Sequence, residues 1–173
     1  MKVQVSDELT INAPASKVWH VLAHDFANID VWSSGIETSR NISDVAIPEG
    51  ATVGGRVCSG GFGGDATEAF TYYDEAGMRF AYKAVGELPW FINSGGNNWS
   101  VRATATNQSM VAFSAEMDLK FWPALVMFLL KPVFKKLLGT RTLEELKYFV
   151  EHDKPHPRKL KIQKKKLYKS ASL

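Results

Sequence analysis

At 173 residues, with 45% hydrophobic and 23% charged side chains, the chain has the length of one domain and the composition of a globular protein. Its single cysteine, Cys58, excludes an intramolecular disulfide. The first residues lack the apolar stretch and cleavage site of a secretory signal. Both features favour a reducing compartment, so we expect a cytoplasmic protein.

The formal net charge of +3 hides an asymmetry between the two ends of the chain. Residues 154–173 contain eight Lys or Arg and no Asp or Glu, whereas the remaining residues carry 13 basic and 18 acidic side chains. We therefore expect a folded domain over residues 1–153 and a basic, disordered tail over 154–173. The tail suits an anionic membrane surface, and the acidic body argues against a nucleic-acid partner.

The first elements are a strand and two helices. Residues 3–12 predict the strand, and Pro14 is favoured at the first helical position, where its missing N–H has no helical partner. An apolar face then follows helical spacing through Val18, Trp19, Val21, Leu22 and Phe26. Residues 25–32 predict a second short helix, which ends at Ser33-Ser34-Gly35.

Strand patterns fill the middle of the chain. They cover residues 36–45, 52–59, 67–74, 78–85, 98–106 and 109–121. Alternation places Glu68, Phe70 and Tyr72 on one face of the fourth strand. It places Met78, Phe80, Tyr82 and Ala84 together on the fifth, and Val111, Phe113, Ala115, Met117, Leu119 and Phe121 together on the seventh.

From Pro123 to Val150 the apolar period becomes helical, with a kink expected at Pro132 because proline removes one helical hydrogen bond. Val126, Leu130 and Phe134 lie on the apolar face of this pattern. The order of elements predicts an α+β fold in which an antiparallel sheet of about seven strands curves around a long C-terminal helix. Such an arrangement leaves room for a cavity, and a cavity suggests a small hydrophobic ligand.

The opening segment INAPASKVWHVL resembles that of the START-like helix-grip superfamily, whose members show the pattern apolar-x-Ala-Pro-x-x-x-Val-Trp. The superfamily includes polyketide cyclase/dehydrase-like proteins, the birch-pollen allergen family and the abscisic acid receptors. The segment from Cys58 to Phe62 resembles the receptors' gate loop, and Gly86 to Trp90 resembles their latch loop. The resemblance covers roughly residues 3–152 and implies the helix-grip fold.

One departure bears on the ligand. The receptors hold a ligand carboxylate with a lysine on the second strand, and the matching position here falls near Glu37. No lysine lies between Val18 and Lys83. This departure argues against a hormone-receptor role.

The sixth strand has two possible registers, and a slip of one residue inverts every side chain. Alternation predicts that Trp99, Val101 and Ala103 point inward. A match to the family's pocket residues instead predicts Asn98, Ser100 and Arg102.

The resemblance and the alternation together suggest a set of ligand-binding residues: Trp32, Phe62, Glu68, Phe70, Tyr72, Phe80, Tyr82, Leu88, Trp90, Asn98, Trp99, Ser100, Phe113, Met117, Val126, Leu130 and Phe134. Glu68 is the sharpest candidate, because an inward carboxylate can anchor a ligand or move a proton. The alternatives are a Glu68 at the mouth of the strand and a Glu68 that pairs with Arg56 or Arg79. Residues 60–64 suggest a gate, with Phe62, Leu88 and Trp90 closing the mouth.

Three functions remain open. The first is binding of a lipid, sterol or polyketide in the cavity. The second is an aromatase/cyclase, in which Glu68 or Tyr82 shuttles protons and Arg56 stabilises an enolate. The third is a lipid-transfer protein that docks on anionic membranes through residues 154–173.

No cofactor or metal is expected. His20 and His24 are four residues apart, but no third ligand is evident and the spacing lacks the glutamate of a zinc-protease helix. Residues 121–130 form an apolar run too short to cross a bilayer.

Overall fold

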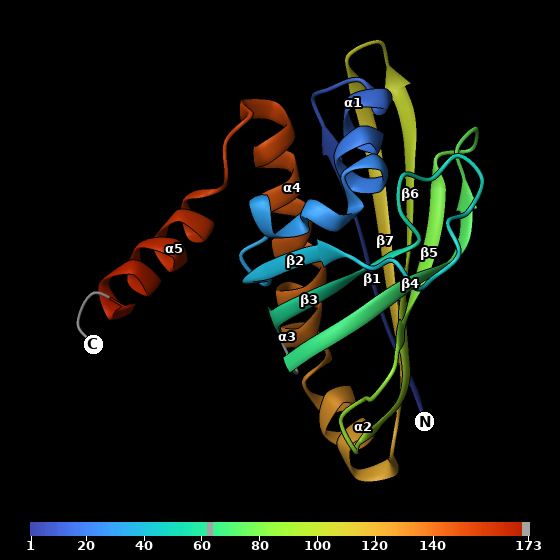
Figure 1. The fold of residues 1–173 in the computed structure, drawn as a ribbon, viewed down its shortest axis with the longest axis vertical. Coiled ribbons are helices and arrows are strands. Elements are labelled where there is room, and N and C mark those ends of the chain that lie inside the picture. The colour runs from blue at the N-terminus through green and yellow to red at the C-terminus, as the bar shows by residue number, and fades with distance from the viewer. Residues whose placement is uncertain (62–63, 171–173) are drawn as a thin grey trace.

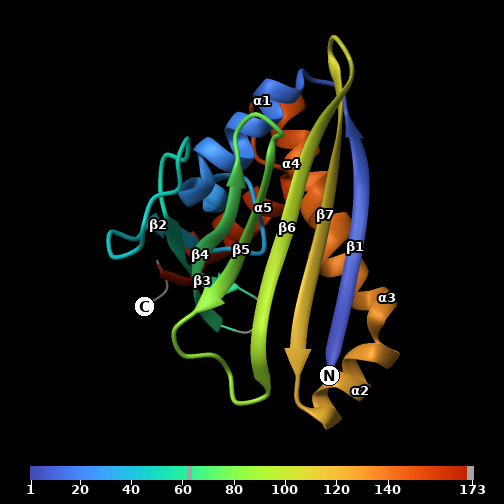
Figure 2. The ribbon, with the colours of Figure 1, turned by 90° about the vertical axis from the view of Figure 1, so that its right-hand side faces the viewer.

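The computed structural model describes residues 1–61 and 64–170. Within them, seven strands form one antiparallel sheet in the order β1-β7-β6-β5-β4-β3-β2 (Figures 1 and 2). The strands are β1 (Lys2–Ile11), β2 (Thr38–Asn41), β3 (Gly55–Gly61), β4 (Gly64–Asp74), β5 (Arg79–Val85), β6 (Ile92–Ala105) and β7 (Gln108–Leu119). The predicted α+β class and sheet size are confirmed.

The helices α1 (Ala15–Trp19) and α4 (Arg141–His152) cover one face of the sheet, together with the π-helical turn η1 (His20–His24) and the 3₁₀ turn η2 (Phe26–Val31). Figure 2 shows the sheet from its other face, with these helices behind it. The apolar spacing explains the arrangement, since α1 buries Val18 and Trp19 and α4 buries Leu143, Leu146 and Val150.

The space between the sheet and these helices is filled by aromatic side chains. Phe26 packs against Phe70, with ring centroids 4.3 Å apart, and Trp99 packs against Phe113 at 4.7 Å. Phe80 contacts both groups. The alternating residues of β5, β6 and β7 therefore supply the core, as their period predicts.

Strand β4 departs from the predicted alternation. A bulge between Phe70 and Tyr72 shifts its pairing with β5 by one residue. Beyond the bulge Tyr73 faces the core against Trp19, whereas Tyr72 is exposed on the outer face. The prediction that Tyr72 shares the inner face with Glu68 and Phe70 is wrong, because the extra residue of a bulge inverts the side chains that follow.

The register of β6 follows the alternation rather than the motif match. Trp99 and Val101 are buried in the core, and Asn98, Ser100 and Arg102 lie on the outer face. The prediction that Asn98 and Ser100 contact a ligand in the interior is wrong. Two large apolar residues gain more from burial than an amide and a hydroxyl would.

The C-terminal helix is broken at its start. Helix α2 (Phe121–Leu129) is capped by Leu130. A continuous helical stretch of 22 residues then follows, made of α3 (Lys131–Phe134), the π-helical η3 (Lys135–Thr140) and α4. Pro132, at the start of α3, has no N–H for the preceding turn, which accounts for the break. Val126 and Leu130 are consequently exposed, so their predicted place in the cavity is wrong, and the Phe134 side chain lies outside what the structure describes.

The basic tail contains a helix, α5 (Pro157–Ser170), where the composition predicts disorder. Its first turn is held to the body, since Arg158 pairs with Glu144 at 2.6 Å and with Glu145 at 3.1 Å. Lys159 is buried and donates to the Ile36 carbonyl at 2.7 Å. These contacts correct the prediction of a disordered segment over residues 157–170.

Candidate functional site

The three residues proposed as catalytic from the sequence lie together in the interior. Arg56 on β3 donates from Nε to Glu68 Oε2 on β4 at 2.7 Å, and from Nη2 to the Tyr82 hydroxyl on β5 at 3.3 Å. Its Nη1 donates to the Phe26 carbonyl at 2.9 Å. The antiparallel register sets Arg56 directly opposite Glu68, so backbone pairing positions the cluster.

The guanidinium of Arg56 is enclosed by aromatic rings. Its Cζ lies 3.9 Å from the centre of the Phe26 ring and 5.1 Å from that of Tyr82. These distances allow cation–π attraction in a desolvated setting. Arg56 is 4% exposed and its partner Glu68 is mostly buried, so the site is a charged pair inside an apolar shell.

The cluster shifts the acidity of its members. Burial opposes the charge on Arg56, but Glu68, Tyr82 and Cys58 together outweigh it, so the pKa of the guanidinium is raised. Burial, with Glu68 nearby, also raises the pKa of the Tyr82 phenol, so this hydroxyl keeps its proton and stays available as a hydrogen-bond donor. The neighbouring Cys58 thiol has its pKa raised by burial, which fits a packed thiol rather than a reactive one.

The ion pair corrects one expectation. Glu68 is not an isolated acid in an apolar cavity but accepts a hydrogen bond from Arg56, the alternative that the sequence left open. A paired carboxylate is an acceptor and an orienting group. The neutral hydroxyl of Tyr82 is therefore the group of this site that offers both a hydrogen-bond donor and an acceptor.

Next to the cluster lies a void of about 10 Å³. It is lined by Val21, Leu22, Asp25, Phe26, Ile29, Trp32, Arg56, Phe80, Tyr82 and Trp99. This volume holds about one water molecule. The prediction of an interior cavity that holds a small ligand is therefore wrong for this conformation, because the rings of Phe26, Phe70 and Phe80 occupy the space.

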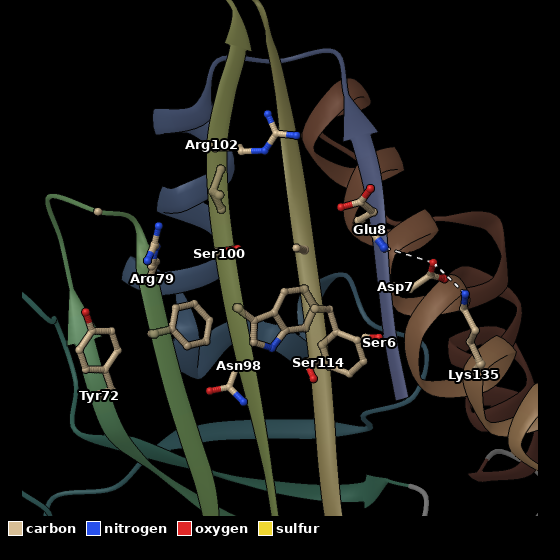
Figure 3. A pocket seen from close by; sticks show the side chains of 16 residues that line it. Ser6, Asp7, Glu8, Tyr72, Arg79, Asn98, Ser100, Arg102, Ser114 and Lys135 are labelled. Carbon is tan, nitrogen blue, oxygen red and sulfur yellow. Dashed lines mark hydrogen bonds and ion pairs between the residues drawn. The ribbon is translucent and has the colours of Figure 1, made fainter. Parts of the chain in front are cut away.

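A larger hollow of about 690 Å³ lies on the outer face of the sheet, open to solvent (Figure 3). Asn98, Ser100 and Tyr72 contribute to it, with Arg79 and Arg102. At its edge Lys135 pairs with Asp7 at 3.5 Å. Its polar side chains are those that a solvated sheet face carries.

The remaining predicted residues divide between core and surface. Trp32 and Phe113 are buried, and Met117 is partly buried beside Val3 and Leu119. Trp90 is exposed and Leu88 is partly exposed, and neither lines the void beside Arg56. Phe62, proposed for the gate, lies outside the described residues.

Sequence reasoning missed the part of η1 and η2 that covers the void, namely Leu22, Phe26 and Ile29. Their apolar spacing predicts burial but not which strand they face. In the part of the chain that the structure describes, no three His, Cys, Asp or Glu side chains gather as metal ligands would. His20 and His24 instead approach each other, with Nδ1 atoms 3.3 Å apart, and His24 contacts Glu75 at 3.0 Å.

Solved structures share this fold at low sequence identity. Norcoclaurine synthase from Thalictrum flavum, in complex with dopamine and hydroxybenzaldehyde, is 17% identical, with a TM-score of 0.64 and 88% of each chain covered. Zhui aromatase/cyclase from Streptomyces sp. R1128 is 16% identical, with a TM-score of 0.64, covering 90% of this chain and 100% of that one. Ara h 8.0201 is 15% identical, with a TM-score of 0.62 and 87% and 98% covered. Among curated proteins, none matches the chain by sequence.

The curved sheet and C-terminal helix therefore form the same helix-grip fold as these structures. The chain belongs to the family described as polyketide cyclase / dehydrase and lipid transport, whose model matches residues 2–151. No helix in the described ranges is both long and apolar enough to cross a bilayer.

Proposed function

We propose that the protein binds a small hydrophobic or aromatic ligand, such as a lipid, sterol or polyketide, between the sheet and the η1–η2 segment. The observation that carries this proposal is the guanidinium of Arg56, buried among aromatic rings and shared between Glu68 and Tyr82. A buried ion pair adds little net stability compared with apolar residues of the same volume. Its presence in a filled aromatic core favours a binding role.

The interior suits such a ligand better than the outer hollow does. Apolar side chains on η1, η2 and β5 would cover an apolar body, while Arg56 and the Tyr82 hydroxyl would bind its polar end. In the outer hollow Arg79 and Arg102 are exposed to water, so a contact there gains little.

Entry requires the η1–η2 segment to move away from the sheet. This segment is irregular, since η1 is π-helical and η2 is kinked at Asn28, with φ −105° and ψ 24°. Such irregular turns often mark functional positions in helices. Because only open molecules bind the ligand, the apparent affinity equals the intrinsic affinity multiplied by the fraction of molecules that are open.

Truncation of Phe26 tests this proposal. Phe26→Ala removes the ring that fills the site, so affinity for 2-naphthol, an aromatic probe with one hydroxyl, is expected to rise about tenfold as the cost of opening falls. The variant also loses about 3–5 kcal/mol of stability, as large-to-small core changes do. Calorimetric titration of the wild type and the variant measures the affinity.

The matched control is Leu146→Ala on α4, which opens the core away from the void. It should lose comparable stability without tighter binding of 2-naphthol. Equal tightening by both variants, or none by Phe26→Ala, would contradict a site beneath η2.

The second candidate is an aromatase/cyclase-type enzyme. The observation that favours it is the approach of Arg56 Nη2 to the Tyr82 hydroxyl, which pairs a stabiliser for an enolate oxygen with a phenol that retains its proton. With a synthetic poly-β-ketone thioester, Tyr82→Phe and Glu68→Gln should abolish cyclisation while binding survives. Equal loss of binding and turnover would leave a binding role alone.

Two further proposals concern the cellular compartment and lipid transfer. The buried thiol of Cys58 and the absence of any second cysteine suit a reducing compartment, and we keep the cytoplasm as the proposed location. The lipid-transfer alternative gains support from the family description, which includes lipid transport.

A further inference from the structure

Helix α2 and the loop between β5 and β6 lie at one end of the molecule (Figures 1 and 2), and their exposed apolar side chains form a large surface there. We call it the apolar tip. Its residues are between 54% and 74% exposed: Trp90, Phe121, Trp122, Val126, Phe128 and Leu129. Contiguous exposed apolar patches on a protein surface usually mark an interaction site.

The two parts of the apolar tip are held together by the fold. The backbone N–H of Lys120, which precedes α2, donates to the Phe91 carbonyl at 3.0 Å. Ala124 is buried against Val3 and Leu119, so α2 is anchored through its smallest apolar residue. The water-facing sides of the helix carry Phe121, Trp122, Leu125, Val126, Phe128 and Leu129.

The charge on the α2 side of the apolar tip has one sign, whereas the loop between β5 and β6 carries one acid, Glu87. Residues 120–143 contain five Lys or Arg and no Asp or Glu. Lys120 lies near the exposed indole of Trp90, with Nζ 5.4 Å from the ring centre, and Lys131 and Lys136 are exposed beside the apolar residues. One ammonium in this segment has an acidic partner, Lys135 with Asp7.

We propose that the apolar tip docks into the surface of an anionic lipid bilayer, with α2 lying in the plane of the interface. A helix of nine residues cannot span a bilayer but can bury one face among the lipid headgroups. Tryptophan prefers this interface, and the surrounding lysines would meet lipid phosphates. A second copy of the chain fits less well, because self-pairing would set lysine against lysine. The proposal stands independently of the interior site.

Vesicle sedimentation with the full chain tests the proposal. The protein should bind vesicles of phosphatidylcholine mixed with phosphatidylserine, and bind pure phosphatidylcholine more weakly. The double variant Trp122→Ser, Leu129→Ser should lose at least about tenfold in affinity for the mixed vesicles, since two large apolar side chains leave the bilayer. Both residues are exposed, so the thermal midpoint of unfolding should be unchanged.

The matched control is Ile47→Ser, Tyr72→Ser, which removes two exposed apolar side chains away from the apolar tip. It should bind as the wild type does. Removal of residues 157–173 separates the contribution of the basic α5. The shortened chain should still bind the mixed vesicles more tightly with the wild-type apolar tip than with Trp122→Ser, Leu129→Ser. The proposal would be overturned if the Trp122→Ser, Leu129→Ser variant bound the mixed vesicles as tightly as the wild type does. It would also be overturned if the wild type were a dimer that these substitutions dissociate.

Discussion

Replacement of Arg56 by methionine is expected to destabilise the protein by about 3–5 kcal/mol, because it leaves the Glu68 carboxylate without its partner inside the core. The Phe26 carbonyl and the Tyr82 hydroxyl lose a donor at the same time. Urea denaturation followed by circular dichroism measures the free energy of unfolding. The structure thus assigns the greatest cost to a charged residue in the centre of an apolar layer.

Two further variants separate charge from packing. Arg79→Met changes the same residue type on β5, but on the exposed outer face, and should alter stability by no more than about 0.5 kcal/mol. Arg56→Met combined with Glu68→Leu should recover part of the loss, since no lone charge remains buried. A cost for Arg56→Met no larger than that for Arg79→Met would contradict the buried cluster.

Glu145 on α4 should be the second sensitive position. Its carboxylate is 1% exposed and accepts from the Ser34 amide at 2.8 Å and the Ser34 hydroxyl at 2.6 Å. It also lies 3.1 Å from Arg158 of α5. Glu145→Ala should cost about 2–3 kcal/mol, the value of hydrogen bonds to a charged group, and should release α5 from the body. Denaturation and limited proteolysis around residues 154–157 report the two effects.

The adjacent residue gives the control. Glu144 also pairs with Arg158, at 2.6 Å, but its side chain is half exposed. Glu144→Ala should therefore cost no more than about 1 kcal/mol and leave α5 resistant to protease. Similar small losses at both positions would show that α5 is not held through Glu145.

Much of the fold follows from local patterns in the sequence. The spacing of Val18, Trp19 and Leu22 defines a helix face, and alternation in β5 and β7 identifies Phe80, Tyr82 and Phe113 as inward residues. The same alternation places Trp99 in the core where a motif match would not. Burial of large apolar side chains determines which residues face the core, so the inward faces can be predicted from a single sequence.

The features that sequence reasoning misses depend on pairing between distant segments. Nothing local marks the bulge after Phe70 that exposes Tyr72, since the bulge is a property of two strands. The ordering of α5 depends on Glu145, which precedes it by more than ten residues and appears in the sequence as an ordinary helix-surface acid. The filled interior likewise depends on how Phe26 of η2 packs against Phe70 of β4.

We infer that a hydrophobic ligand enters beneath the η1–η2 segment and reaches Arg56. The most direct test is a titration of the wild-type protein with 2-naphthol, followed through its backbone amide resonances by NMR. Entry beneath this segment should concentrate the shifts at residues 20–31 and on β3 and β5 around Arg56 and Tyr82. Shifts confined to the outer hollow around Asn98 and Ser114, or to the apolar tip, would contradict it.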